Sequence, residues 1–171
     1  MSGRTDTGPA GQPRPEQPDA GRRGYRRIVV GVDGSPVSRQ ALRWAADEAE
    51  LRDCALEVVY GWQVSTEPRP PDVDLGVAPP LEVYQRRAEE RIHGVVAETL
   101  GPGRIARVTV AAVHRTPGRA LIEQARDADL LVLGSKGHGR LAAWLLGSIS
   151  EEAVQRAPCS VVIVRPRPGE D

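Results

Sequence analysis

Residues 130–150 read LLVLGSKGHGRLAAWLLGSIS, and the order of patterns within them indicates the fold class. The run opens with four apolar residues, which is the pattern of a strand buried on both faces. Three glycines follow within residues 134–139, and a Gly-Ser pair at Gly147-Ser148 precedes a segment with helical spacing. A buried strand, a glycine-rich connection and a helix start are typical of one βα unit in a parallel sheet.

The same alternation of strand and helix runs along the whole chain. Ser35-Pro36 and Thr116-Pro117 each place a capping residue before a proline, which is a helix-start signal, and another helix is predicted over residues 81–100. Strands are predicted at 28–32, 56–60, 108–113, 130–133 and 161–164. This alternation predicts an α/β protein with a single doubly wound five-stranded parallel sheet and helices on both faces.

Composition divides the chain into one domain and two tails. Residues 1–24 are rich in Gly, Pro and Arg and hold almost no apolar side chains, so we expect a disordered N-terminal tail. The domain is predicted over residues 25–166, and residues 167–171 are expected to be a short disordered tail. A chain of 171 residues leaves little room for a second domain.

The charge balance argues against several classes of partner. The chain has 23 basic and 23 acidic residues, so we expect neither nucleic acid nor an anionic membrane surface as a partner. Since no apolar run approaches the roughly 20 residues of a membrane helix, a cytoplasmic protein is expected. The three histidines lack metal-ligand spacing, and no protein metal site is predicted.

Two loops that should lie at the carboxyl edge of the sheet carry candidate functional residues. Asp33-Gly34-Ser35 follows the first strand, and residues 134–150 follow the fourth. Glycines let backbone amides approach phosphate oxygens, and a helix N-terminus carries a partial positive charge of about half a unit. Ser148 with Glu151 also has the spacing of a capping box. These features predict a phosphate-binding site.

The spacing Gly134-x2-Gly137-x9-Gly147-Ser148 resembles the ATP-binding motif of nucleotide-binding universal stress proteins. The resemblance extends over residues 26–165 and includes the segments at 28–35, 128–134 and 158–164. It implies a Rossmann-like sheet of the adenine nucleotide alpha hydrolase type, with ATP held between the ends of the first and fourth strands. It also implies Mg²⁺ carried by the nucleotide, a homodimer formed through the last strand and a role as a nucleotide-dependent regulator in stress response, acting on an unknown protein partner.

The same resemblance implies roles for individual residues. Gly134 would lie against the ribose, and Asp33 would accept a hydrogen bond from the nucleoside or help to hold the divalent ion. The backbone at Gly61, expected just after the second strand, would contact adenine. Phosphates would meet the amides of Gly137, Gly147 and Ser148 and the Ser148 hydroxyl, with Ile149 and Ser150 completing the helix start.

Other readings of the chain stay open. Gly137-x-Gly139-x-x-Ala142 imitates a dinucleotide-binding fingerprint, although that fingerprint normally opens the first βαβ unit. A slow ATP hydrolase or phosphotransferase would lack the GxxxxGK[ST] loop that usually serves such chemistry. A nucleotide-independent interaction or chaperone-like protein is the third possibility, and whether AMP or a cyclic nucleotide replaces ATP is open as well.

Overall fold

One parallel sheet forms the centre of the protein. The computed structural model describes residues 24–69, 71, 78–135 and 146–166. In these ranges five parallel strands are arranged in the order β3-β2-β1-β4-β5. They are β1 (Arg27–Gly31), β2 (Ala55–Trp62), β3 (Val108–His114), β4 (Leu130–Gly134) and β5 (Ser160–Val164). The prediction of a five-stranded parallel sheet is confirmed.

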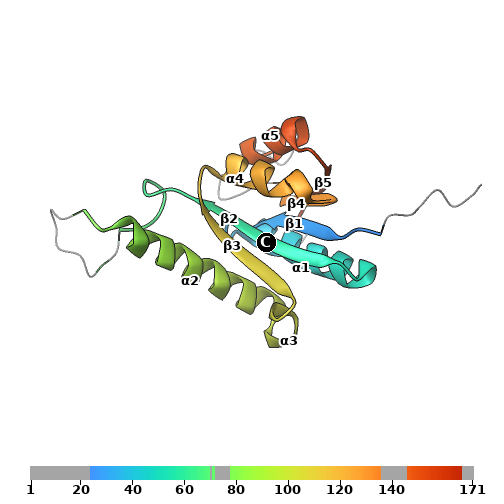
Figure 1. Cartoon of the computed structure of the whole chain (residues 1–171), viewed down its shortest axis with the longest axis horizontal. Coiled ribbons are helices and arrows are strands. Elements are labelled where there is room, and N and C mark those ends of the chain that lie inside the picture. Colours follow the sequence, from blue (N-terminus) through green and yellow to red (C-terminus); the bar gives the residue numbers. More distant parts are fainter. Residues whose placement is uncertain (1–23, 70, 72–77, 136–145, 167–171) are drawn as a thin grey trace, which may run out of the picture.

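Helices cover both faces of this sheet, as Figure 1 shows. They are α1 (Pro36–Arg52), α2 (Leu81–Leu100), the short α3 (Pro102–Ile105), α4 (Pro117–Gln124) with a 3₁₀ turn η1 (Ala125–Asp127), and α5 (Ser148–Arg156). Successive strand residues point to opposite faces, so Val30 packs in the core beneath α1 and α2 while Val29 packs beneath α4 and α5. The sheet is therefore doubly wound, as predicted.

The crossovers change sides between β1 and β4. These strands are neighbours, paired from Ile28↔Leu130 to Val30↔Val132. The helix that follows β1 lies on one face of the sheet, and the helix that follows β4 lies on the other. Ligands of open α/β sheets bind outside the carboxyl ends of the strands at such a switch point. The fold thus places the carboxyl ends of β1 and β4, where the two candidate loops begin, beside each other.

Two element boundaries differ from the sequence-based prediction. β2 continues to Trp62, because Gly61 and Trp62 pair with Val113 and His114 of β3. Gly61 lies inside the strand, so the prediction that it follows the strand was wrong. α5 begins at Ser148 with Gly147 as its N-cap in an extended conformation, and no side chain caps it. The predicted capping box was wrong for this reason.

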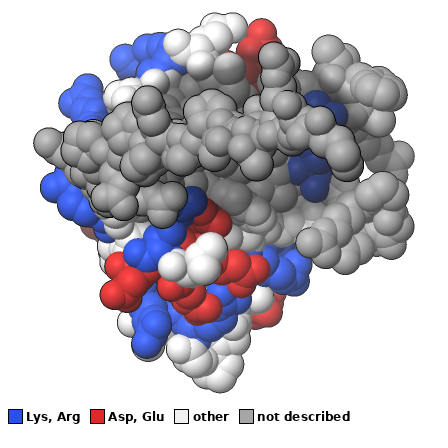
Figure 2. Space-filling view, turned by 90° about the vertical axis from the view of Figure 1, so that its right-hand side faces the viewer, with Lys and Arg blue, Asp and Glu red and all other residues white. Residues whose placement is uncertain are grey.

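The surface carries charges of both signs. On the face shown in Figure 2, the described basic and acidic side chains are interspersed. Arg104 is one example of local pairing, since it forms ion pairs with Asp47 and Glu50. Among the described residues, no helix has the length and apolar character that crossing a bilayer requires. Because the described charges of both signs are interspersed, an anion would be recognised by local groups rather than by a broad electrostatic field of one sign.

Candidate functional site

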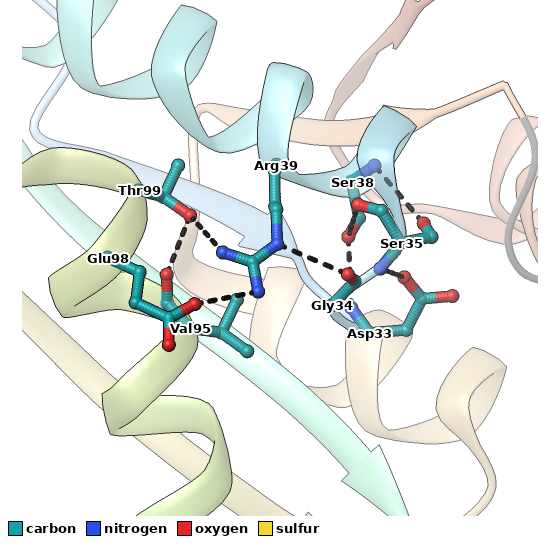
Figure 3. A network of polar contacts seen from close by, with 8 residues as sticks. All are labelled: Asp33, Gly34, Ser35, Ser38, Arg39, Val95, Glu98 and Thr99. Atoms are coloured by element: carbon teal, nitrogen blue, oxygen red, sulfur yellow. Dashed lines mark hydrogen bonds and ion pairs between the residues drawn. The ribbon is translucent and has the colours of Figure 1, made fainter. Parts of the chain in front are cut away.

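The loop after β1 is a tight turn that starts α1. Gly34 has a φ of +86°, a left-handed conformation that glycine adopts without the cost of a side chain. The Ser35 amide donates to Asp33 Oδ1 at 2.9 Å, and Ser35 Oγ accepts from the Ser38 amide at 3.3 Å as the N-cap of α1. The partly buried Asp33 carboxylate thus has a structural role in this turn (Figure 3).

The end of β4 is in close contact with the first turn of α1. A Cβ at Gly134 would lie 3.0 Å from Val37 Cγ1 and 3.1 Å from the Val37 carbonyl carbon. These distances are shorter than ordinary van der Waals contacts, so glycine is needed here for packing. Ser135, which follows, is 7% exposed and donates its amide to the Val164 carbonyl at 2.7 Å. These contacts of Gly134 and Ser135 fix the position at which the chain leaves the sheet.

The start of α5 is joined to this same point by two hydrogen bonds. The Gly147 amide donates to the Ser135 carbonyl at 2.9 Å, and Ser150 Oγ donates to the Gly134 carbonyl at 2.8 Å. The first helical bond of α5 runs from the Glu151 amide to the Gly147 carbonyl. The amides of Ser148, Ile149 and Ser150 therefore have no acceptor within the helix, as at any helix N-terminus.

The backbone of Gly61 points past the end of β1. The Val59 carbonyl oxygen accepts from the Val32 amide at 3.0 Å, so the N–H and C=O of Val59 point toward β1. Alternate residues of a strand direct their N–H and C=O to the same side, so those of Gly61 also point toward β1, beyond its last paired residue Gly31. A Cβ at Gly61 would lie 2.5 Å from Pro117 Cα of α4. The backbone groups of Gly61 are thus directed past the carboxyl end of β1, and a side chain at this position would clash with α4.

Comparison with known proteins identifies the family. Residues 24–165 match the family model described as the universal stress protein family. The chain belongs to this family. A universal stress protein of Mycolicibacterium smegmatis is 36% identical over 145 residues, covering 82% of this chain and 46% of the relative. The universal stress protein described here spans about half the length of the curated relatives it matches, 46% to 49% for the first four.

Solved structures of similar proteins share the fold. A universal stress protein in complex with cAMP is 26% identical with a TM-score of 0.54, covering 84% of this chain and 99% of that one. The hypothetical protein MJ0577 has a TM-score of 0.64 at 18% identity, covering 85% of this chain and 99% of that one. This second likeness shows the fold alone. The Rossmann-like sheet implied by the sequence resemblance is thereby confirmed for this universal stress protein.

The structure gives protein partners to two of the residues for which the sequence predicted a role. The Gly147 amide donates to the Ser135 carbonyl, and the hydroxyl of Ser150, which is 4% exposed, donates to the Gly134 carbonyl. Ser148 and Ile149 are exposed at the helix start. Gly137 lies outside the described residues. In the part of the chain that the structure describes, no three side chains of His, Cys, Asp or Glu gather closely enough to hold a metal ion.

Arg39 is a residue of this site that the sequence analysis missed. Its guanidinium contacts the Gly34 carbonyl and two residues of α2, Glu98 and Thr99. No local pattern singled out Arg39 among the arginines of the chain, because its partners Glu98 and Thr99 lie 59 and 60 positions away in the sequence.

A surface pocket of about 260 Å³ lies at the opposite end of the sheet, away from these groups. Its lining includes Cys54 and Arg104, but Arg104 is already paired with Asp47 and Glu50. Burial raises the pKa of the Cys54 thiol, which favours the unreactive protonated form. The candidate site is therefore the edge formed by the loop after β1, the ends of β2 and β4 and the start of α5.

Proposed function

We propose that this universal stress protein is a cytoplasmic ATP-dependent regulator that binds the nucleotide at the switch point between β1 and β4. The observation that carries the proposal is the start of α5, where the amides of Ser148, Ile149 and Ser150 lack helical acceptors directly beside the end of β4. A universal stress protein of 26% identity was solved with cAMP, which supports an adenine nucleotide as the ligand class.

The phosphates would bind at the α5 N-terminus. Its aligned peptide dipoles and unpaired amides favour an anion, and the exposed Ser148 side chain can add a hydroxyl donor. The bonds from Gly147 and Ser150 to the end of β4 hold this helix start in place before any ligand arrives. Preorganised donors bind more tightly because less freedom is lost on binding.

The base and the ribose would bind along the ends of β1 and β2. The Gly61 N–H and C=O form a donor and acceptor pair directed past the end of β1, which matches the paired donor and acceptor on the edge of adenine. Asp33 would accept from the ribose or help to hold Mg²⁺ carried by the nucleotide. The groups described here are suited to binding and orienting a nucleotide, so we propose regulation rather than rapid turnover.

The nucleotide-bound protein would act as a homodimer. β5 lies at one edge of the sheet, and the residues of its run from Val161 to Val164 are only partly buried. An apolar edge strand is a natural pairing surface for a second copy. Bound nucleotide would change the surface that the dimer presents to a protein partner.

The proposal is tested by calorimetric titration of the purified protein with ATP and Mg²⁺, using two substitutions at Ser148. Ser148→Pro removes one amide donor, and proline is tolerated at the first helical position. The preceding Gly147 already has the extended conformation, φ −65° and ψ 152°, that proline requires of its neighbour. Ser148→Ala is the matched control, since it removes the hydroxyl and keeps the amide.

We expect one ATP site in the wild type. Ser148→Pro should weaken binding roughly 10- to 100-fold, the range for a hydrogen bond to a charged group, and Ser148→Ala should weaken it by less. Wild-type protein that binds no adenine nucleotide, and carries none through purification, would refute the proposal. Release of phosphate at a steady rate during the titration would instead favour a slow hydrolase.

A further inference from the structure

We infer that Arg39 is a positioning residue for the nucleotide site, because it fixes the peptide group that orients the Asp33 carboxylate. The inference rests on the proposed function and adds a residue to it. Figure 3 shows the arrangement: the Arg39 guanidinium lies between the loop after β1 and the last turns of α2. Arg39 does not itself contact the carboxylate in this network, so its effect on Asp33 passes through the backbone.

The Gly34–Ser35 peptide group is held at both ends. Its carbonyl oxygen accepts from Arg39 Nε at 3.3 Å, and its N–H donates to Asp33 Oδ1 at 2.9 Å. The two bonds require one orientation of the same peptide plane. Because glycine adopts many backbone conformations at low cost, Gly34 alone would not keep the plane in this orientation. The bond to Arg39 supplies the missing restraint.

The other side of the guanidinium is anchored on α2. Nη1 donates to Thr99 Oγ1 at 3.1 Å, and Nη2 pairs with Glu98 Oε2 at 3.0 Å. Thr99 Oγ1 in turn donates to the Val95 carbonyl at 2.6 Å, and Val95 Cγ2 lies 3.5 Å from the position of a Cβ on Gly34. The restraint on the loop is therefore transmitted from a packed helix.

The ion pair contributes little to stability by itself. The Glu98 side chain is 69% exposed and that of Arg39 is 28% exposed, and exposed pairs are weakened by solvent. Arg39 also stands in the first turn of α1, where the helix dipole disfavours a cation. Arg39 nevertheless donates to three acceptors, one in the loop after β1 and two on α2. Its main effect is therefore on the conformation of the loop rather than on the free energy of unfolding.

The experiment compares Arg39→Met with Arg43→Met. Methionine keeps most of the apolar stem and removes the guanidinium, and Arg43 is an exposed arginine one turn further along α1. For Arg39→Met we expect ATP to bind roughly three- to tenfold more weakly, as for the loss of one hydrogen bond. Arg43→Met should bind ATP as the wild type does. Both variants should keep the wild-type melting temperature within a few degrees.

Two further readouts separate positioning from a general structural role. In an Asp33→Ala background, Arg39→Met should cause no additional loss of ATP binding, because its effect passes through Asp33. In nucleotide-free protein, amide hydrogen exchange at Ser35, followed by NMR, should be faster in Arg39→Met and unchanged in Arg43→Met. This second measurement needs no nucleotide.

The inference stands only if both the binding and the exchange results agree with it. If the wild type binds ATP and Arg39→Met binds it equally well, or if Ser35 exchange is unchanged, the role of Arg39 is refuted while nucleotide binding stands. Additive losses in the double variant would refute it as well. If the wild type binds no nucleotide, the proposed function and the positioning role fall together, even where Ser35 exchange responds.

Discussion

Ser150 Oγ donates to the Gly134 carbonyl at 2.8 Å, and this bond joins the first turn of α5 to the last residue of β4. The two residues are 16 positions apart in the chain, and Ser150 is 4% exposed. Since the α5 N-terminus carries the proposed phosphate donors, the bond sets where those donors lie relative to the sheet. Substitution of Ser150 should therefore affect both stability and binding.

Ser150→Ala would leave the Gly134 carbonyl without its partner. We expect the free energy of unfolding to fall by about 1–2 kcal/mol, the usual cost of an unsatisfied buried group, and ATP binding to weaken with it. Urea unfolding measures the first effect, and the control is Ser148→Ala at the exposed first position, which should change stability by less than about 0.5 kcal/mol. Equal effects of the two variants would contradict the role given to this bond.

Gly61→Ala should destabilise the protein by about 1–3 kcal/mol, the range for overpacking, because the new Cβ would lie 2.5 Å from Pro117 Cα. Gly94→Ala is the matched control. Gly94 lies in α2 with nothing within 4 Å of an added Cβ, so the substitution should raise stability by about 0.5–1 kcal/mol. Thermal unfolding of both variants measures these changes in stability. A Gly61→Ala variant as stable as the wild type would contradict the close packing of α4 on β2.

Asp129 should make folding sensitive to acid. The Arg26 and Arg27 amides donate to Asp129 Oδ2 at 2.7 and 3.1 Å, and these bonds lower the pKa of the carboxyl from its ordinary 3.8. A lowered folded-state pKa gives stability that is present above pH 3.8 and is lost as the pH falls through the folded-state value.

Asp129→Asn should accordingly cost about 0.5–1 kcal/mol at pH 7, allowing for screening by solvent, and the gap to the wild type should close as the pH falls below about 4. Urea unfolding between pH 3 and pH 7 measures this difference. Asp127→Asn, at an exposed position two residues earlier, is the control. A gap that stays constant with pH would show that the charge of Asp129 is not involved.

Tyr60 should resist ionisation at alkaline pH. Burial raises the pKa of its phenol well above the ordinary 10.0, and its hydrogen bond to the carboxylate of Glu67 raises it further. The stability from this group is present below pH 10 and is lost as the pH rises through the folded-state value. The difference in ultraviolet absorbance between wild type and Tyr60→Phe should show this phenol titrating only above its ordinary range.

Tyr60→Phe removes the hydroxyl donor from Glu67, whose side chain is 3% exposed and whose other partner, Arg91, lies 3.7 Å away. We expect a loss of about 1.5–3 kcal/mol at pH 7 by urea unfolding, as for a hydrogen bond to a buried charged group. Tyr60→Phe combined with Glu67→Gln should recover part of the loss, because the buried charge is removed. A double variant less stable than the single one would contradict this account.

Local patterns were enough to predict the architecture of this protein. These patterns involve only a few neighbouring residues, so they can be recognised without knowing the fold. They are the apolar runs of strand length, the helical spacing of apolar residues, and the helix starts at Ser35-Pro36 and Thr116-Pro117. Strict alternation of these elements then leaves few topologies, because crossovers are right-handed and connections are short. The placement of the carboxyl ends of β1 and β4 at one edge of the sheet followed from the same rules.

The roles of individual atoms depended on contacts between distant segments. The Gly147 amide bonds to Ser135, just after β4, and the Ser150 hydroxyl bonds to the last residue of β4. Gly61 packs against α4, and Arg39 contacts α2. All of these partners are far from the residue concerned in the sequence. Each backbone amide or hydroxyl has several possible acceptors, and only packing decides which one is near. Residue types and spacing therefore determined the fold and the edge that carries the site, whereas the tertiary structure decided which donors at that edge remain for a ligand.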